Sequence, residues 1–357
     1  MAELDQEKVK GFVGRMADIL NGGMLSLMTS IGYQTGLFEA MAGLAPANSE
    51  KIASEAGLNE RYVREWLDTM VTGRIIDYSP ENGTYVLPPE HATWLTLASG
   101  PDNMAAMAHC VPLLARVQED IVECFRKGGG VFYDQFSEFM ALWAGLNEKT
   151  FEQTLISEVV PLVPGLPERL AQGIDVLEIG CGEGHSLNLL ASEYSASQFR
   201  GYEFRPDAVQ EATAKAKSLG SNNVKFESVD ISKLGESAVY DLILAFDVIH
   251  DQAHPRAVLK NVADALRPDG VFLMIDVQAS SDVHENLDHP TGPFLYTIST
   301  MHCMTVSLAL DGEGLGTMWG ERKALELLAE AGFHDVAVER VDGDNFNNFY
   351  VARKGVI

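Results

Sequence analysis

The sequence predicts an α/β fold, a mostly parallel sheet covered by helices on both faces, preceded by a smaller and mostly helical domain. Strand formers at 175–179 lead into a glycine turn and then into helical spacing. Three later runs, 199–203, 224–230 and 240–247, and a fourth ending at Asp276 are nearly continuous in apolar residues, as parallel strands covered on both faces are. Upstream of them, the pattern is helix, turn, helix and hairpin.

The glycine turn after the first strand indicates which ligand binds at the sheet edge. Its pattern is Glu178-x-Gly180-x-Gly182-x-Gly184, whereas a dinucleotide fingerprint has the spacing G-x-G-x-x-G. Such a turn places a ligand over the first N–H groups of the helix. The carboxylate of Glu178 would repel a pyrophosphate but suits the cationic amine and sulfonium of S-adenosylmethionine. The pattern resembles the first motif of class I methyltransferases; a domain for another nucleotide is the alternative.

Side chains at the ends of the next strands complete the predicted cofactor site. Glu203 lies about 20 residues past the glycine turn, where an acid can bind both ribose hydroxyls. Phe204 follows it and is expected to lie along the adenine. The resemblance to methyltransferases implies that Asp230 receives the adenine amino group and that Ile231 packs on the ring. Phe246, in the strand 240–247, is also assigned to the cofactor.

The pattern between residues 48 and 89 predicts a winged helix. Ser49 and Asn59 are expected to cap two short helices, and Asn82-Gly83 predicts a hairpin between two short strands. The segment holds four basic and seven acidic residues, so it lacks the basic face that DNA binding needs. We therefore favour a dimerisation and lid domain over a DNA-binding one.

The composition predicts a soluble cytoplasmic protein that binds neither nucleic acid nor a membrane. Its 357 residues include 26 Lys plus Arg and 51 Asp plus Glu, a net charge of −25 that disfavours polyanionic partners. No apolar run reaches the ~18 residues of a spanning helix, and the first residues lack the basic start of a signal peptide. Cys110, Cys124, Cys181 and Cys303 have no paired spacing, so reduced thiols are expected.

Three parts are expected along the chain. They are a helical winged-helix dimerisation domain at 1–90, a helical linker and lid at 91–170, and a cofactor-binding domain at 171–357 with a substrate-pocket insertion at 278–320. The apolar stripe from Phe12 to Ile31 is wider than one core contact requires, which predicts a homodimer. In the lid, Tyr133 follows a glycine run and is assigned to the cofactor, with an aromatic anchor for its loop as the alternative.

The whole chain resembles the two-domain, S-adenosylmethionine-dependent methyltransferases of mycobacteria and other bacteria, which have an N-terminal winged helix. The segments that carry the resemblance are 36–40, 59–66, 87–91 and 299–307. The architecture is also similar to that of plant-type small-molecule O-methyltransferases. The resemblance implies a Rossmann-like, seven-stranded class I methyltransferase domain and leaves the acceptor open.

The catalytic base is sought at the end of the strand 240–247. His250-Asp251 matches the His-Asp pair that plant-type O-methyltransferases carry there, and the resemblance implies that His250 removes the acceptor proton. Imidazole suits this role because its ordinary pKa is near 6.5. Gln252 departs from that family, where an aromatic residue is usual. A structural, hydrogen-bonding role for His250 is the alternative.

The insertion is expected to form the acceptor pocket. A helix at 297–304 would place His302 as a polar group in the wall, with Met301 and Met304 as an adaptable apolar surface. The histidine and cysteine spacings of the insertion fit no zinc pattern, so no metal is expected.

The sequence therefore predicts S-adenosylmethionine-dependent methyl transfer to a small-molecule acceptor, with His250 as general base. S-methylation of a small thiol without a required base is the first alternative, since thiols ionise nearer neutral pH. An S-adenosylmethionine-sensing regulator built on the winged helix is the second. Whether oxygen, sulfur or nitrogen is methylated stays open.

Overall fold

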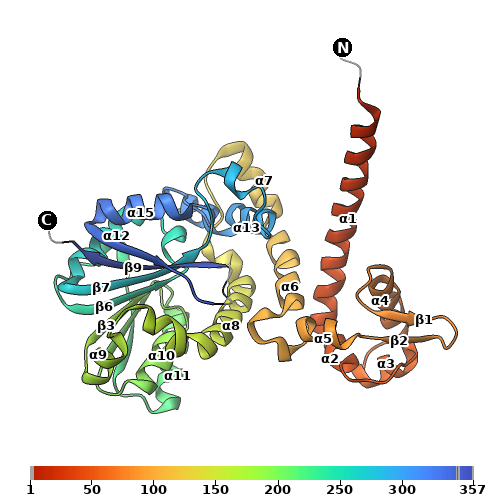
Figure 1. Cartoon of the computed structure of the whole chain (residues 1–357), viewed down its shortest axis with the longest axis horizontal. Helices are drawn as coiled ribbons and strands as arrows, with labels where there is room; N and C mark the ends of the chain where they lie inside the picture. Colours follow the sequence, from red (N-terminus) through yellow and green to blue (C-terminus); the bar gives the residue numbers. More distant parts are fainter. Residues whose placement is uncertain (1–3, 343, 345, 356–357) are drawn as a thin grey trace. The chain divides into compact units, whose positions relative to one another are not determined.

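The computed structural model describes residues 4–342, 344 and 346–355 (Figure 1). The chain divides into two compact units, Met1–Arg116 and Val117–Ile357. The first unit therefore includes the start of the expected linker, and the second includes the rest of it. No helix among the described residues is long and apolar enough to cross a membrane.

The first unit is a helical domain with one β-hairpin. Its helices are α1 (Gln6–Thr35), α2 (Leu37–Met41), α3 (Ser49–Ala56), α4 (Glu60–Thr72), α5 (Pro89–Leu95) and α6 (Met104–Ala115). The hairpin pairs β1 (Asp77–Ser79) with β2 (Thr84–Val86), as the Asn82-Gly83 turn predicts. The predicted N-cap of α3 was wrong by one residue: Asn48 accepts from the Lys51 N–H, and Ser49 instead donates to Glu60. Asn caps a helix as well as Ser does, and here it comes first.

Trp66 of α4 is the centre of the first unit's core. It is 2 % exposed, and its indole N–H donates to the carbonyl of Met28 at 2.8 Å. The ring of Phe38 meets it edge to face at 5.3 Å between centroids. A side chain at Gly32 would lie 2.6 Å from both rings, so only glycine lets α1 approach this closely.

The second unit is built on a seven-stranded sheet. Its strands are β3 (Asp175–Ile179), β4 (Gln198–Glu203), β5 (Val224–Ser228), β6 (Tyr240–Phe246), β7 (Leu266–Val277), β8 (Phe333–Glu339) and β9 (Asn347–Lys354). Their order is β5-β4-β3-β6-β7-β9-β8, parallel except for β9, which is antiparallel to both its neighbours. This confirms the predicted fold class.

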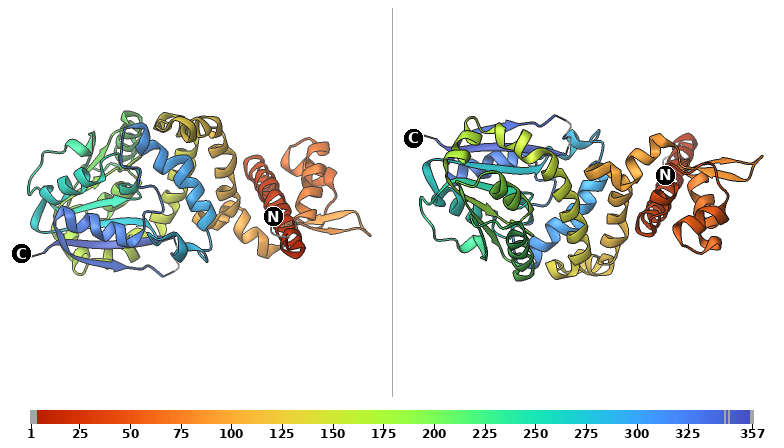
Figure 2. Two further views of the ribbon diagram at one scale, coloured as in Figure 1. Left: turned by 90° about the horizontal axis from the view of Figure 1, so that it is seen from above. Right: turned by 90° about the horizontal axis from the view of Figure 1, so that it is seen from below.

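Helices cover both faces of this sheet (Figure 2). The helices of the second unit are α7 (Gln118–Lys127), α8 (Ser137–Thr154), α9 (Leu166–Gln172), α10 (His185–Glu193), α11 (Pro206–Leu219), α12 (Pro255–Ala265), α13 (Gly292–Ile298), α14 (Met304–Ala309) and α15 (Gly320–Ala331). Side chains alternate along the strands: Val176 packs in one core with α10 and α11, whereas Leu177 packs in the other with α12 and α15. Each central strand must therefore be apolar on both faces.

The strand order reverses beside β3. From β3 the chain proceeds outward through β4 and β5, and then returns to place β6 on the other side. In an open parallel sheet, ligands bind at the carboxyl ends of the strands at such a switch point. Glu203 and Phe246 lie at these ends, as the final residues of β4 and β6.

The insertion after β7 contains a π-helix. The segment Ser299–Cys303 joins α13 to α14 and has five-residue rather than four-residue hydrogen-bond spacing. The predicted helix at 297–304 is therefore present, but its turns are wider than those of an α-helix.

Candidate active site

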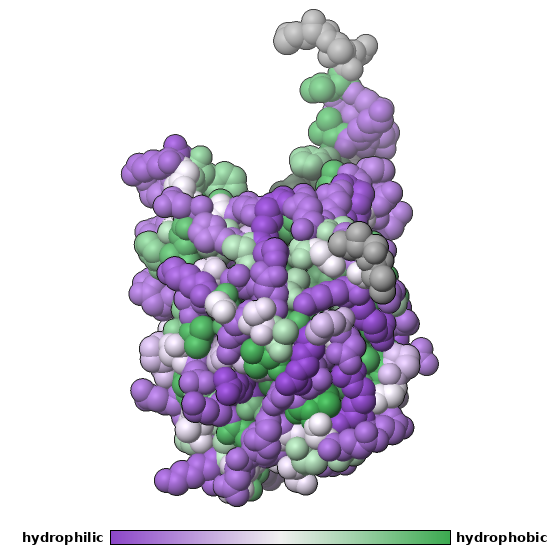
Figure 3. All heavy atoms as spheres, turned by 90° about the vertical axis from the view of Figure 1, so that its left-hand side faces the viewer, coloured by the Kyte–Doolittle hydropathy of each residue, from purple (hydrophilic) through white to green (hydrophobic). Residues whose placement is uncertain are grey.

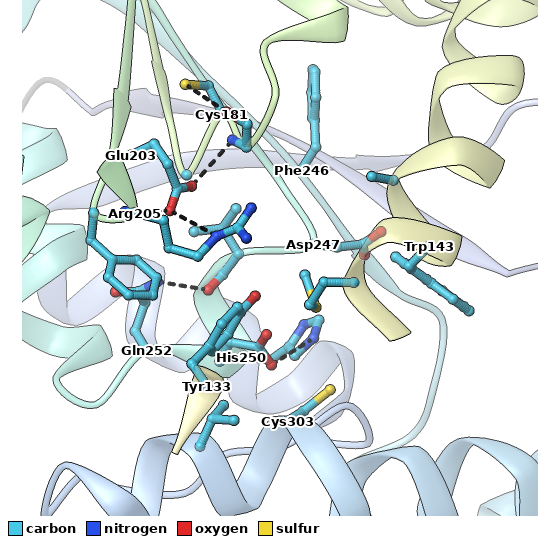
Figure 4. A pocket seen from close by; sticks show the side chains of 18 of the residues that line it. Tyr133, Trp143, Cys181, Glu203, Arg205, Phe246, Asp247, His250, Gln252 and Cys303 are labelled. Atoms are coloured by element: carbon cyan, nitrogen blue, oxygen red, sulfur yellow. Dashed lines mark hydrogen bonds and ion pairs between the residues drawn. The ribbon is translucent and has the colours of Figure 1, made fainter. Parts of the chain in front are cut away.

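A cavity of about 850 Å³ lies in the second unit, at the carboxyl ends of the strands (Figure 4). Its wall comes from the turn Tyr133–Phe136 and α8, from the loops after β3, β4, β5 and β6, and from the insertion. The predicted site residues in this wall are Tyr133, Glu178, Gly180, Gly182, Glu203, Phe204, Asp230, Ile231, Phe246, His250 and His302. The sequence motifs thus meet in one place.

The glycines of the turn have different functions. Gly182 has φ 51°, lines the cavity, and has nothing within 4 Å of the point where a Cβ would stand. The backbone there is bare, as close approach of a ligand requires. Gly184 does not line the cavity: a Cβ on it would lie 2.6 Å from the ring of Phe226. Its role is the packing of α10 against the sheet.

Glu203 joins the end of β4 to the glycine turn. Its side chain is buried, Oε2 accepts from the Gly182 N–H at 3.2 Å, and Oε1 accepts from the Arg205 N–H at 3.0 Å. Figure 4 shows the carboxylate between the loop at Cys181 and Arg205. Carboxylate oxygens each accept more than one hydrogen bond, so this fixed group can also receive a ribose diol.

Glu178 is a buried acid with one partner. It is 3 % exposed, and the Ser186 hydroxyl donates to it at 2.5 Å. Burial raises the pKa of the carboxyl to about 8, while the Ser186 hydrogen bond acts in the opposite direction. The group is thus mostly neutral at pH 7 until a cation approaches it. A bound ammonium group would supply that cation.

The part of the cavity where the adenine is expected is more exposed to solvent than the part around Glu178 and Glu203. Asp230 caps the turn Ile231–Lys233 through the Ser232 N–H, and Lys233 pairs with it at 2.7 Å. The Lys233 and Ser232 hydrogen bonds hold the pKa of Asp230 below its usual value, so the acid is ionised. Phe204 is 54 % exposed and meets the ring of Tyr133 edge to face at 5.4 Å. That contact fits both roles considered for Tyr133.

His250 is held by a carboxylate that the sequence analysis missed. Its Nδ1 lies 2.8 Å from Asp276 Oδ1, and the same oxygen accepts from the Trp319 indole at 2.9 Å and the Val277 N–H at 2.8 Å. Both His250 and Asp276 are buried, at 4 % and 0 % exposed. Asp276 lies near the end of β7, which pairs with the strand β6 that precedes His250. An acid near the end of the neighbouring strand was therefore the signal available in the sequence.

The surroundings of the two histidines in the cavity wall shift their pKa values in opposite directions. Burial opposes a charge on His250, but Asp276 and Asp251 outweigh it and raise the pKa well above 6.5. Burial lowers the pKa of His302 despite Asp251. The rings of Tyr133, Phe136 and Phe139 surround His302 at 5.3, 4.7 and 5.0 Å between centroids. His302 is thus neutral, and His250 tends to carry a proton.

The predicted apolar wall of the acceptor pocket differs from the one observed. Met301 and Met304 are not among the residues that line the cavity, whereas Cys303 and Val306 are. His302 faces the cavity, and neighbouring positions on a helix are about 100° apart, so Met301 and Met304 point to other sides. The expectation overlooked this spacing.

Comparisons with known proteins agree with this architecture. Residues 23–97 match the family model of an Rv2258c-like winged HTH domain, and residues 170–332 match that of a methyltransferase domain. The chain is a winged-helix protein with a methyltransferase domain. The match to the methyltransferase family model confirms the predicted methyltransferase domain. Solved structures of similar fold hold S-adenosylmethionine or S-adenosylhomocysteine, which agrees with the predicted cofactor.

Curated relatives match less than half of the chain. Trans-aconitate 2-methyltransferase of Methylobacterium nodulans is 26% identical over 152 residues, 43% of this chain and 54% of that protein. (S)-coclaurine N-methyltransferase of Papaver somniferum is 26% identical over 151 residues, 40% of this chain and 43% of that protein. The chain thus spans about half the length of these relatives.

Solved structures share the fold over the whole chain. Mitomycin 7-O-methyltransferase has a TM-score of 0.70 at 17% identity, with 98% of this chain and 100% of that chain covered. Human N-acetylserotonin methyltransferase, solved in complex with its cofactor, has a TM-score of 0.69 at 18% identity, with both chains fully covered. At these identities the likeness establishes the fold alone.

Proposed function

We propose that this protein transfers a methyl group from S-adenosylmethionine to a small-molecule acceptor, with His250 as the general base. The observation that carries the proposal is His250 in the wall of a cavity that also contains the glycine turn and Glu203, with its Nδ1 held by the buried Asp276. A base and a cofactor cradle in one cavity are what in-line transfer to an ionisable acceptor requires.

S-adenosylmethionine supplies an already activated methyl group, so the protein's task is to orient the acceptor and remove its proton. Asp276 bonds Nδ1 of His250 and thereby leaves Nε2 as the atom that receives the proton. The carboxylates of Asp276 and Asp251 then stabilise the imidazolium that results. Phe139, Trp143 and Leu295 line the cavity and exclude water from the acceptor.

The test is methyl transfer from radiolabelled donor to phenols, thiols and amines. A labelled product from at least one small molecule is the expected result. Transfer to thiols alone, at a rate that does not depend on His250, would support the thiol alternative. No transfer to any class, with intact binding of S-adenosylhomocysteine, would contradict the proposal.

Cofactor binding should weaken as the pH falls below about 8. The neutral form of Glu178 prevails below its pKa of about 8, and a bound ammonium group requires the ionised form. Binding should therefore release a proton, and the Kd of S-adenosylhomocysteine should rise by up to about tenfold per pH unit on going from 8 to 6. Calorimetry in buffers of different ionisation enthalpy measures both effects. The Glu178→Gln variant should lose the pH dependence, and a flat profile in the unmutated protein would place the amine elsewhere.

We also propose that the protein is a homodimer formed through α1. Every residue from 4 to 24 is exposed, and among them Phe12, Val13, Leu20 and Met24 are 61 to 64 % exposed. Figure 3 shows apolar surface along the first turns of this helix. A 30-residue helix with such a surface needs a cover, and a second copy supplies a matching one.

Sedimentation at micromolar concentration is expected to show a dimer. Phe12→Asp together with Leu20→Asp should give a monomer, because two charges would be buried in the interface. Leu219→Asp, on the exposed surface of α11, is the matched control and should leave the dimer intact. A monomeric unmutated protein would reject this assignment of the stripe.

The regulator alternative rests on the winged helix. In α4, Arg61 forms an ion pair with Glu65, and Arg64 forms one with Glu60. The charges of both arginines are therefore neutralised within the helix. The proposal of an enzyme therefore predicts only weak, salt-sensitive affinity for DNA in a titration.

The cysteines among the described residues are free thiols, which supports a reducing, cytoplasmic location.

A further inference from the structure

Four buried polar atoms at one end of the cavity lack a hydrogen-bond partner among the described residues. They are Asp247 Oδ1, Asp251 Oδ1, Asp276 Oδ2 and His302 Nε2. Native proteins leave few such atoms, because an unmade hydrogen bond costs the full desolvation of the group. Asp247, Asp251 and His302 line the cavity, whereas Asp276 lies behind His250, and Asp251 Oδ1 also lies 3.3 Å from His250 Nε2. The unmet groups in the wall indicate that a ligand completes them.

Three of the atoms are carboxylate oxygens, which accept hydrogen bonds, and the role of His302 Nε2 depends on the tautomer of the ring. Asp276 and His302 are buried, at 0 % and 3 % exposed. A ligand group that donates hydrogen bonds would therefore suit the carboxylates in the wall.

The local charge is negative. Single oxygens of Asp247 and Asp276 lie with a His250 nitrogen inside a 4.8 Å group, and an oxygen of Asp251 is within the same distance of His250 and Cys303. Three carboxylates thus surround one imidazolium. Burial and the nearby Asp276 raise the pKa of Asp247 to about 7, and the charge of His250 offsets them only in part. A positively charged ligand group would relieve this excess.

The adjoining wall is apolar. Phe139, Trp143, Leu295, Ile298 and Val306 line the same cavity, and Figure 4 shows the polar groups Asp247 and His250 together with Tyr133 and Trp143 around the opening. Aromatic side chains favour both an apolar body and a nearby ammonium group. The apolar wall and the carboxylates together suit a ligand that has an apolar body and a positively charged group.

We infer that the methyl acceptor carries a protonated amine on an apolar, aromatic-sized body, and that the carboxylates of Asp247 and Asp251 bind this amine. The inference rests on the proposed function and specifies its substrate class. An ammonium group offers three donors and one positive charge, which matches the unpartnered oxygens without disturbing the His250–Asp276 pair.

A divalent metal fits less well. Asp276 Oδ1 already accepts from His250, Trp319 and the Val277 N–H. A metal that used the Asp247, His250 and Asp276 group would have to take a proton from the imidazole and break that arrangement. An amine acts through Asp247 and Asp251 and leaves it intact.

The experiment compares matched ligands on the full-length protein saturated with S-adenosylhomocysteine. Each pair holds an arylethylamine and the same skeleton with a methyl group in place of the ammonium; 4-(2-aminoethyl)phenol with 4-propylphenol is one pair, and indole and naphthalene pairs extend the series. Calorimetry at pH 7 after treatment with chelator should show the amine binding at least tenfold more tightly in the best pair. Asp247→Asn and Asp251→Asn should each reduce that preference at least threefold, whereas Asp134→Asn, at the exposed side of the same cavity, should keep it.

Three outcomes would overturn the inference: equal binding within every pair, no binding of either member, or binding that returns only when Mg²⁺ or Zn²⁺ is added. Retained affinity for S-adenosylhomocysteine shows that each variant is folded. The proposed function fails separately, when no acceptor of any charge is methylated. Methylation of neutral phenols without an amine preference would leave the function standing and remove this substrate class.

Discussion

His250→Ala is expected to lower turnover by about 10²–10⁴-fold on a hydroxyl acceptor while leaving the Kd of S-adenosylhomocysteine nearly unchanged. The hydroxyl must lose its proton as the methyl group arrives, and His250 is the buried imidazole whose other nitrogen is fixed by Asp276. Single-turnover rates with radiolabelled donor measure the loss. Near-full turnover of the variant on a hydroxyl substrate would rule out the base assignment, and joint loss of cofactor binding would make His250 structural.

The pH profile tests the same residue independently. A base works in its neutral form, and the charges of Asp276 and Asp251 hold the pKa of His250 well above 6.5 despite burial. Turnover of the unmutated protein should therefore rise with pH and should still be rising well above pH 6.5. Asp276→Asn removes the strongest of the charges that raise this pKa, so the rise should move to lower pH. On a thiol acceptor, the profile should follow the substrate's own pKa instead, and His250→Ala should cost far less.

Glu203→Ala is expected to weaken binding of S-adenosylhomocysteine by about 1.5–3 kcal/mol, roughly 10- to 150-fold. The carboxylate is the proposed acceptor for the ribose hydroxyls, and it also receives the N–H groups of Gly182 and Arg205. Glu227→Ala, on the neighbouring strand β5, is the control and should not change the Kd measured by calorimetry. Equal affinity of the Glu203 variant and the unmutated protein would show that the ribose lies elsewhere.

The fold could be predicted because its signals are local. Parallel strands buried on both faces are apolar throughout. The glycine turn is formed by residues that are close together in the sequence and include Gly180 and Gly182. The carboxyl ends of β3, β4 and β6 then meet by topology, which explains why Glu178, Glu203 and His250 line one cavity.

The rest of the site depends on contacts between distant residues. Asp276 is 26 positions from His250, and Trp319 is 43 positions from Asp276. No local sequence pattern indicates that His250 and Trp319 both hydrogen-bond to Oδ1 of Asp276. Gly184 was assigned to the cofactor for the same reason: only the folded structure shows that the ring of Phe226 occupies the space beside it.

The wide turn at Ser299–Cys303 has a consequence for comparing this protein with its relatives. Each residue of an α-helix advances the chain by about 100°, so one extra residue in a turn rotates everything after it by that amount. Where a relative's helix lacks this wide turn, an alignment without a gap would pair Met304 and Val306 with residues on a different side of that helix. Acceptor-wall residues downstream of Cys303 should therefore be matched by their place around the cavity rather than by sequence position alone.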